Sequence, residues 1–480
     1  MRRPGRGGRE AVALRASRRL GLLDEHGVPY AAGATEGGDA SWASLDAGGP
    51  GRGLHWYTGE GAQGGWRTGP LRIFAAVAGD AATARFAATL PGDWTREVEL
   101  VGRDRAWIWR SREGGSILPF DPDDAVANLR SERYQRLTRR GGARGRALAR
   151  RGYYAVRPAL PRRVQIALRR TAARAQQRTE FPRWPVESAL HDLVDLVLQR
   201  VADAAGAGVP RLAAWPAGHS WALVLTHDVE TAAGRDAIES VRALEAGLGY
   251  RSSWNLVPER YEVPDELVAH LQRAGCEVGV HGLRHDGRDI DPLRTMLRRL
   301  PEMRRWAERW GAVGFRAPAT HRVWERMPQL GFEYDTSYPD TDPFEPMAGG
   351  SCSWLPFFND GMVELPITLP QDHTVFTILR RDESLWRDKA DFLRTRGGMA
   401  LLIVHPDYAD ERLLAAYEEF LSSYRDDGGV WTALPHEVAA WWRRRAATSV
   451  QLEDGEWRAV GAGADEADIE FAEPAPEWRR

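Results

Sequence analysis

Residues 221–230, WALVLTHDVE, join an apolar run to a short series of polar side chains. The apolar part, Ala222–Thr226, is typical of a strand buried inside a parallel sheet, which is covered on both faces. Thr226-His227-Asp228-Val229-Glu230 would then lie where this strand ends. From Trp221 onward, similar apolar runs alternate with amphipathic stretches, and this alternation predicts an α/β fold with a parallel sheet.

The whole of residues 221–445 follows this alternation. Seven or so β/α repeats predict a distorted (β/α)7-type barrel in the C-terminal half of the chain. Helices are predicted at 234–247, 264–274, 292–310, 384–396, 409–424 and 435–445. Strands are predicted at Ala222–Thr226, Ser253–Val257, Glu277–His281, Val313–Arg316 and Met399–His405, with weaker ones near Phe332 and Val430.

Charged side chains follow five of these predicted strands. In parallel β/α barrels the carboxyl ends of the strands meet on one face, where active sites lie. Folding alone does not require charges there, because buried charges must be hydrated or paired. The segments that deliver them are Thr226-His227-Asp228-Val229-Glu230, His281-Gly282-Leu283-Arg284-His285, Gly314-Phe315-Arg316-Ala317-Pro318, Asp335-Thr336-Ser337-Tyr338 and Val404-His405-Pro406-Asp407-Tyr408.

The spacing of four of these residues indicates a metal site. Asp228 and Glu230 are two apart, so their side chains point the same way on an extended backbone. His281 and His285, four apart, can present two imidazoles to one ion if the turn after the strand is helical. Two imidazoles and one carboxylate leave a coordination position open, which is typical of a catalytic divalent metal.

In this order, the five segments resemble the motifs of the polysaccharide deacetylases of carbohydrate esterase family 4. That family carries Thr-Phe-Asp-Asp, His-Ser/Thr-x-x-His, Arg-x-Pro, an Asp-containing segment and a terminal Leu-x-Ile-x-x-His. A branch with peptidoglycan deacetylases and allantoinase-like hydrolases has Asp-x-Asp in the first motif, which residues 226–230 resemble. The resemblance covers about 225 residues, under half of the chain.

The resemblance implies a metal site with an adjacent base. It implies that Glu230, His281 and His285 are the ligands of a divalent metal, for which zinc is the first candidate. It implies that Asp228 is the general base that deprotonates water. Glu230 stands where the branch has aspartate, and Val229 occupies the ligand position of the commoner Asp-Asp motif. Asp228 therefore stays open as an alternative carboxylate ligand.

The remaining roles implied by the resemblance complete an amide hydrolase. Arg316 matches the residue that orients the base, and Asp335 matches the acid that supports the terminal histidine. His405 matches the general acid that protonates the leaving amine, a task suited to a pKa near neutrality. His227 and Asp407 are treated as polar neighbours of the site and not as ligands.

The leading functional prediction is a metal-dependent hydrolase that removes N-acetyl groups from an amino-sugar-containing glycan or glycan precursor. The alternatives are a hydrolase of a small non-sugar amide or ureide, and a non-catalytic carbohydrate-binding protein with a degenerate barrel. Most of the 20 Trp are expected to pack in the core. Trp254, Trp324 and Trp354 are predicted nearer the barrel loops, where they could stack on sugar rings.

The rest of the chain is predicted to form other parts. Residues 1–65 are expected to be a flexible Gly-rich N-terminus, 66–130 a small β-rich module with an α+β character overall, and 131–215 a basic helical connector. The acidic residues 446–480 are expected to be a disordered tail.

The segment from Arg130 to Arg183 holds 17 Arg and only two acids. Val164, Ala167, Leu168 and Ala172 fall on one face of a helix that Pro161 can open. This predicts either a solvated connector or a basic surface in peripheral contact with anionic membrane or an anionic glycan carrier. With a net charge of 65 − 67 = −2, the chain does not have the basic balance of a dedicated nucleic-acid binder. The N-terminal segment lacks the apolar core of a secretion signal, so a cytoplasmic location is expected.

Overall fold

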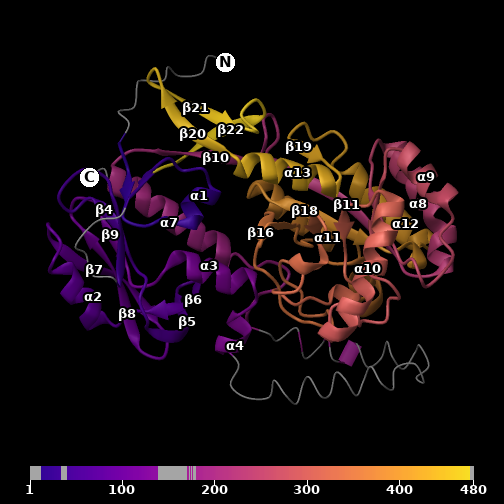
Figure 1. Cartoon of the computed structure of the whole chain (residues 1–480), viewed down its shortest axis with the longest axis horizontal. Coiled ribbons are helices and arrows are strands. Elements are labelled where there is room, and N and C mark those ends of the chain that lie inside the picture. Colours follow the sequence, from indigo (N-terminus) through magenta and orange to yellow (C-terminus); the bar gives the residue numbers. More distant parts are fainter. Residues whose placement is uncertain are drawn as a thin grey trace. The chain divides into compact units, whose positions relative to one another are not determined.

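A computed structural model describes residues 12–33, 41–138, 170–171, 173, 176 and 180–475. The chain divides into two compact units (Figure 1). One unit, here the barrel unit, spans 141–187 and 218–443, and the other, here the flanking unit, spans 1–140, 188–217 and 444–480. The helix predicted to begin at Pro161 lies outside the described residues.

The barrel unit is built on one curled sheet whose strands follow the order β16-β17-β15-β14-β13-β12-β11-β18. All pairs along this path are parallel except the β16–β17 hairpin. A ninth strand, β19, pairs with β11. The strands are β11 (Trp221–Val229), β12 (Ser253–Leu256), β13 (Glu277–Val280), β14 (Gly314–Phe315), β15 (Tyr334–Asp335), β16 (Phe357–Asn359), β17 (Met362–Glu364), β18 (Met399–Val404) and β19 (Val430–Thr432).

The two ends of this sheet are joined by the chain that follows β17. The backbone N–H groups of Thr368 and Leu369 donate to the carbonyl of Leu401 in β18, at 3.3 and 3.0 Å. Thr368 Oγ1 also donates to the carbonyl of Met399 at 2.7 Å. The prediction of a mixed α/β fold with a distorted (β/α)7-type barrel is thereby confirmed.

Helices follow most of the parallel strands, as the alternation of the sequence predicts. They are α8 (Ala232–Leu248), α9 (Asp265–Arg273), α10 (Leu293–Trp310), α11 (Ser384–Thr395), α12 (Glu411–Ser422) and α13 (Pro435–Ala446). Short 3-10 turns are η2 (Pro318–Thr320), η3 (Pro328–Leu330) and η5 (Pro406–Tyr408), and η4 (His373–Leu379) is a π-helix. Thr231 and Asp410 cap the first turns of α8 and α12 through their side-chain oxygens.

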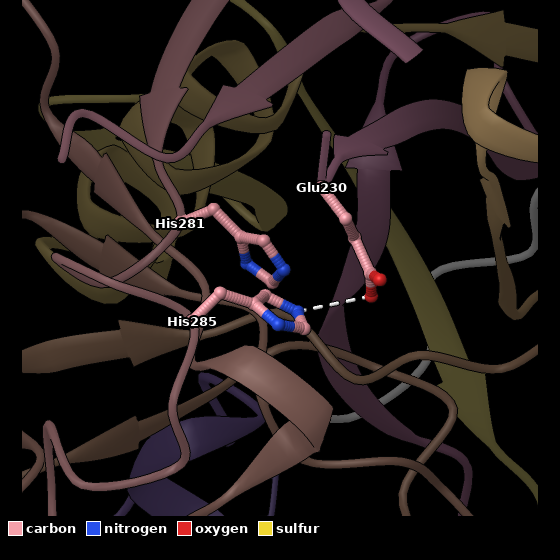
Figure 2. Close-up of side chains that lie close together, drawn as sticks. All are labelled: Glu230, His281 and His285. Carbon is pink, nitrogen blue, oxygen red and sulfur yellow. Dashed lines mark ion pairs between the residues drawn. The ribbon is translucent and has the colours of Figure 1, made fainter. Parts of the chain in front are cut away.

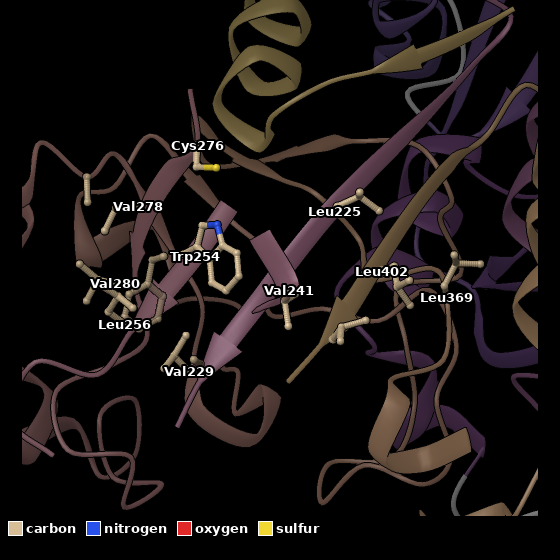
Figure 3. Packing of buried hydrophobic residues seen from close by; sticks show 14 of the residues in the cluster. Leu225, Val229, Val241, Trp254, Leu256, Cys276, Val278, Val280, Leu369 and Leu402 are labelled. Carbon is tan, nitrogen blue, oxygen red and sulfur yellow. The ribbon is translucent and has the colours of Figure 1, made fainter. Parts of the chain in front are cut away.

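The core of the barrel unit fills the space between strands and helices. All nine residues of β11 are buried, as expected for a parallel strand covered on both faces (Figure 3). Trp254 lies in this core with no exposed surface, stacked on His227, and Trp354 is also buried against Phe392. The prediction that Trp254 and Trp354 could stack on sugar rings at the barrel loops is therefore wrong, because both rings are buried in the core and pack on other side chains. Trp324 is half-buried.

The flanking unit contains a nine-stranded sheet in the order β2-β1-β3-β4-β9-β8-β7-β5-β6. Its strands are β1 (Arg15–Ala16), β2 (Ala31–Ala32), β3 (Trp42–Asp46), β4 (Gly53–Tyr57), β5 (Ala62–Thr68), β6 (Leu71–Val77), β7 (Trp94–Val101), β8 (Arg105–Ser111) and β9 (Ser116–Leu118). Its helices are α1 (Gly21–Glu25), α2 (Asp80–Ala87), α3 (Pro122–Arg130), α4 (Tyr134–Thr138) and α7 (Ala189–Ala205). Two further antiparallel pairs are β10 (Val209–Pro216) with β22 (Ala467–Ala472), and β20 (Thr448–Glu453) with β21 (Glu456–Gly461).

The structure corrects the predictions for both ends of the chain. The described part of residues 1–65 holds β1 to β5, because alternating residues such as Leu54 and Trp56 bury one face of the sheet. The tail after 446 is ordered from 448 to 472, because β20 and β21 form a hairpin and β22 pairs with β10. Asp454 and Gly455, both with positive φ, make the two-residue turn of that hairpin. Among the described residues, no helix combines the length and apolar character needed to cross a bilayer.

Candidate active site

The candidate site lies at the carboxyl ends of the barrel strands. Asp228 is the last residue but one of β11, and Glu230 follows that strand directly. His281 follows β13, Arg316 follows β14 and His405 follows β18. Because these strands run parallel, their ends meet on one side of the sheet.

Glu230, His281 and His285 form a cluster in which one ligand atom from each lies within 4.8 Å of the others (Figure 2). Glu230 Oε1 is 2.9 Å from His285 Nε2. The segment that carries the two histidines is not helical, and both Gly282 and His285 have positive φ. In Figure 2 both imidazoles and the carboxylate point toward one another, as a shared cation requires.

The residues of this cluster fit a divalent metal ion. His281 Nδ1 lies 3.0 Å from the carbonyl of Arg316, which holds its proton and leaves the lone pair of Nε2 toward the cluster. That buried Nε2 has no hydrogen-bond partner. Burial lowers the pKa of His281 to about 4, with Asp228 opposing the shift, so the ring is in the neutral form that binds metals. A set of two imidazoles and one carboxylate suits zinc and related transition metals.

Asp228 is held by two partners that leave one of its oxygens toward the cluster. Oδ1 accepts from Arg316 at 3.1 Å and from Asn255 Nδ2 at 3.0 Å. Oδ2 lies 3.8 Å from His281 Nε2. Burial raises the pKa of Asp228, but Arg316 and His281 lower it by more, and the net pKa is below its ordinary value. The carboxylate is therefore ionised and can accept a proton.

Arg316 is fully buried and connects two strand ends. Its Nε donates to the carbonyl and to Oγ1 of Thr336, at 3.1 and 2.8 Å. One terminal nitrogen donates to both Thr226 Oγ1 and Asp228 Oδ1. This fixed guanidinium orients Asp228 and compensates its buried charge.

His405 is held by Asp372, a residue that the sequence motifs do not single out. Asp372 Oδ1 lies 2.6 Å from His405 Nδ1, and Oδ2 accepts from the backbone N–H of His405 at 2.8 Å. His405 Nε2 then lies 3.9 Å from Glu230 Oε1. Burial lowers the pKa of His405, but Asp372 and the nearby carboxylates raise it by more, to about 10. The imidazole is therefore a protonated donor beside the cluster.

Asp335 does not lie at His405 and has other partners. It accepts from Ser337 Oγ at 2.6 Å and shares a hydrogen bond with Glu364, its neighbour in the β15–β17 register. Burial raises the pKa of both carboxyls, and their mutual repulsion raises that of Glu364 further. The assignment of Asp335 to the terminal histidine is therefore corrected, and Asp372 occupies that place. Asp372 follows a segment with no strand pattern, and no motif in the sequence marks it as a partner of His405.

The two polar neighbours, His227 and Asp407, take different positions. His227 points to the helix side of β11, where its Nε2 lies 2.7 Å from Glu245 Oε1. Its Nδ1 lies 2.9 Å from the carbonyl of Val404, directly before His405. Asp407 accepts from the backbone N–H of Glu230 at 2.8 Å and from the hydroxyl of Thr231. Asp407 therefore fixes the backbone of the residue that completes the cluster.

Comparisons with known proteins give similarity at the level of solved structures. No family model matches the chain, and no curated protein matches it in sequence. A proposed polysaccharide deacetylase from Mycobacterium smegmatis is 21% identical over 48% of this chain and 93% of its own, with a TM-score of 0.41. Puue allantoinase is 20% identical over 48% and 92% (TM-score 0.37), and a family 4 carbohydrate esterase from Streptomyces lividans is 13% identical over 45% and 93% (TM-score 0.29). Each of these similarities covers less than half of this chain. The chemistry of the site is therefore inferred from the contacts of its own residues.

Proposed function

We propose that the barrel unit is a metal-dependent amide hydrolase of the polysaccharide deacetylase type, which removes N-acetyl groups from an amino-sugar-containing glycan or glycan precursor. One observation carries the proposal. The cluster of Glu230, His281 and His285 lies between an ionised carboxylate, Asp228, and a hydrogen-bond donor, His405, at 3.8 and 3.9 Å from cluster atoms. Amide hydrolysis needs a cation site, a base and an acid together.

The metal would be held by Glu230, His281 and His285, with zinc as the first candidate. A divalent cation bound there supplies Lewis acidity toward the amide oxygen and makes water a stronger acid. Asp228 is the proposed acceptor of the proton that water loses, since Arg316 and Asn255 hold it with one oxygen toward the cluster. Arg316 keeps that carboxylate ionised and aligned.

The leaving amine requires a proton, which a second residue beside the cluster must donate. His405 is the proposed donor, because Asp372 accepts from its Nδ1 and so leaves Nε2–H toward the cluster. The amine then departs as a neutral group attached to its sugar. Cytoplasmic glycan assembly is the proposed setting, and contact of the Arg130–Arg183 segment with anionic membrane stays a prediction.

Metal analysis and acetate release test the proposal. The purified full chain, loaded with zinc, is given N-acetylglucosamine and its oligomers, and acetate is measured. We expect about one metal ion per chain and acetate release that a chelator stops. Asp228→Asn should keep the metal and lose acetate release, whereas His281→Ala should lose the metal as well. Release of product from a ureide but not from acetylated sugars, or a chain that binds no metal, would refute the proposal.

A further inference from the structure

The peptide group that precedes the candidate acid His405 is held at both of its ends. Its N–H donates to Asp372 Oδ2 at 2.8 Å, and its carbonyl, which belongs to Val404, lies 2.9 Å from Nδ1 of His227. A carbonyl oxygen can only accept, so His227 Nδ1 carries a proton and donates it there. The orientation of this peptide sets the direction in which the His405 side chain leaves the backbone, so the two hydrogen bonds help to aim the imidazole.

His227 lies where the strand that carries the proposed base is joined to the strand that carries the proposed acid. His227 and Val404 are the last residues that β11 and β18 pair with each other. The residue after the first is Asp228, and the residue after the second is His405. The hydrogen bond from His227 therefore fixes the two strand ends relative to each other at the point where their backbone pairing stops.

The ring of His227 is itself held by a buried polar network. Its Nε2 lies 2.7 Å from Glu245 Oε1 in α8, and it stacks on Trp254 with ring centroids 4.1 Å apart. Glu245 also accepts from Tyr417 of α12 and from Ser252, both at 2.6 Å. All five residues are buried. Buried polar groups must keep their hydrogen bonds, so this network holds the His227 ring in one orientation.

Packing alone does not require a polar network at this place. The two preceding positions on the same side of β11, Leu223 and Leu225, are apolar and belong to the core. An apolar side chain at position 227 would continue that core, and replacing a buried ionic pair by apolar groups is often neutral or stabilising. The contact that an apolar side chain could not make is the hydrogen bond to Val404.

We propose that His227 is a positioning residue for the proton transfer to the leaving amine, because its bond to the Val404 carbonyl aims His405 at the cluster. The inference rests on the proposed function, in which His405 is the acid. His227 points to the helix side of β11 and acts only through the peptide of His405. It therefore supports the step that uses the proton of the acid, whereas the metal, the base and substrate binding do not depend on it.

The test compares variants in a background without an unpaired buried charge. Removing His227 alone would leave the Glu245 carboxylate without its partner, which is strongly destabilising. Glu245→Gln is therefore the reference, since its amide can still donate to His227 Nε2. The double variant His227→Phe/Glu245→Gln keeps a ring on Trp254 and loses the bond to Val404. His227→Asn in the same background places an amide N–H near the position of Nδ1 and should restore that bond.

Two substrates separate the aim of the acid from a general loss of structure. Acetate release is measured, on zinc-loaded full chains, from N-acetylglucosamine oligomers, whose amine needs a proton, and from para-nitrophenyl acetate, whose nitrophenolate leaves without one. Relative to the reference, His227→Phe should lower kcat for the acetamide about 10- to 100-fold, since a misplacement of about 1 Å costs about 100-fold. KM, zinc content and kcat for the ester should stay within about threefold, and His227→Asn should recover most of the lost kcat.

Tyr250→Phe is the matched control, because it removes another buried hydrogen bond of the barrel unit, from the Tyr250 hydroxyl to the carbonyl of Leu421 at 2.8 Å. It should change neither activity. Equal losses on the two substrates, no loss on the acetamide, or no recovery in His227→Asn would overturn the proposal. His227→Gln, whose longer amide extends toward position 245 and leaves Val404 without this donor, replaces the phenylalanine variant if that variant does not fold.

A second readout does not depend on activity. If the wild type releases no acetate from acetylated sugars, the proposed function fails. In that case, or if the ester is not cleaved, NMR spectra of isotope-labelled histidine decide, with the His405 ring assigned by His405→Asn. His405 ring resonances that change in His227→Phe and stay in Tyr250→Phe would support the positioning role, and resonances that are the same in His227→Phe and the reference would overturn it.

Discussion

Replacing Asp372 with asparagine should slow acetate release while leaving the fold and the metal in place. Asp372 accepts two hydrogen bonds from His405, one from Nδ1 at 2.6 Å and one from the backbone N–H at 2.8 Å. Asparagine is isosteric and its oxygen can keep one of these bonds, but its amide N–H₂ cannot accept the other. Burial lowers the pKa of His405, and the charge of Asp372 opposes that effect. When this charge is removed, the pKa falls, and a smaller fraction of the imidazole carries the proton that it must donate.

The size of the effect follows from the bond that is lost. A hydrogen bond to a charged group contributes about 1.5–3 kcal/mol, and about 1.36 kcal/mol corresponds to tenfold in rate. Asp372→Asn should therefore lower kcat for acetate release about 10- to 150-fold. The zinc content should stay at the wild-type value, since Glu230, His281 and His285 hold the metal without Asp372. A kcat within about threefold of the wild type, at equal zinc content, would refute the role given to Asp372.

Three further variants address the base, the acid pair and the core. Arg316→Lys should lower kcat about 10- to 100-fold at unchanged zinc content, because an ammonium cannot bond Thr336 and Asp228 at once; equal kinetics would contradict this. In urea titrations, the free energy of unfolding of Glu364→Gln should rise relative to that of the wild type as pH rises from about 5 to about 9. Burial first, and Asp335 second, raise the pKa of Glu364 in the fold, so the stability it contributes is present at low pH and lost as pH rises through that pKa. Parallel pH curves for the two proteins would speak against a shared proton. Trp354→Ala should cost about 3–5 kcal/mol of unfolding free energy, and a loss below about 1 kcal/mol would mean that the ring is not core.

Much of the barrel could be predicted from residue patterns, because its strands are buried on both faces. An unbroken apolar run such as Leu223–Leu225 indicates a buried strand even when the strand that pairs with it is unknown. The predicted helices that alternate with these strands show the 3.6-residue period. The predicted strand at Met399–His405 ends one residue after the observed Val404, and α9 begins at Asp265 where 264 was predicted. Local signals of this kind place each polar strand end, and the parallel fold then brings the ends together.

The parts that could not be predicted depend on contacts with distant segments. Asp372 reaches His405 because the chain after β17 crosses to β18, and no pattern in residues 365–372 marks that crossing. β22 becomes a strand by pairing with β10, more than 250 positions away in sequence. The Asp454-Gly455 turn, by contrast, was a local signal of a hairpin inside a segment whose acidic composition suggested disorder.

The end of β11 explains why Asp228 and Glu230, two residues apart, take different positions. Thr226 and Asp228 point to the same side, where one nitrogen of Arg316 contacts both, while His227 points to the helices. Asp228 is thereby committed to Arg316 and Asn255 through Oδ1. Glu230 lies beyond the last residue of the strand, with its backbone held by Asp407, and its extra methylene lets Oε1 come within 2.9 Å of His285. The longer side chain at position 230 therefore suits the ligand role, and the geometry favours Glu230 over Asp228 as the carboxylate of the cluster.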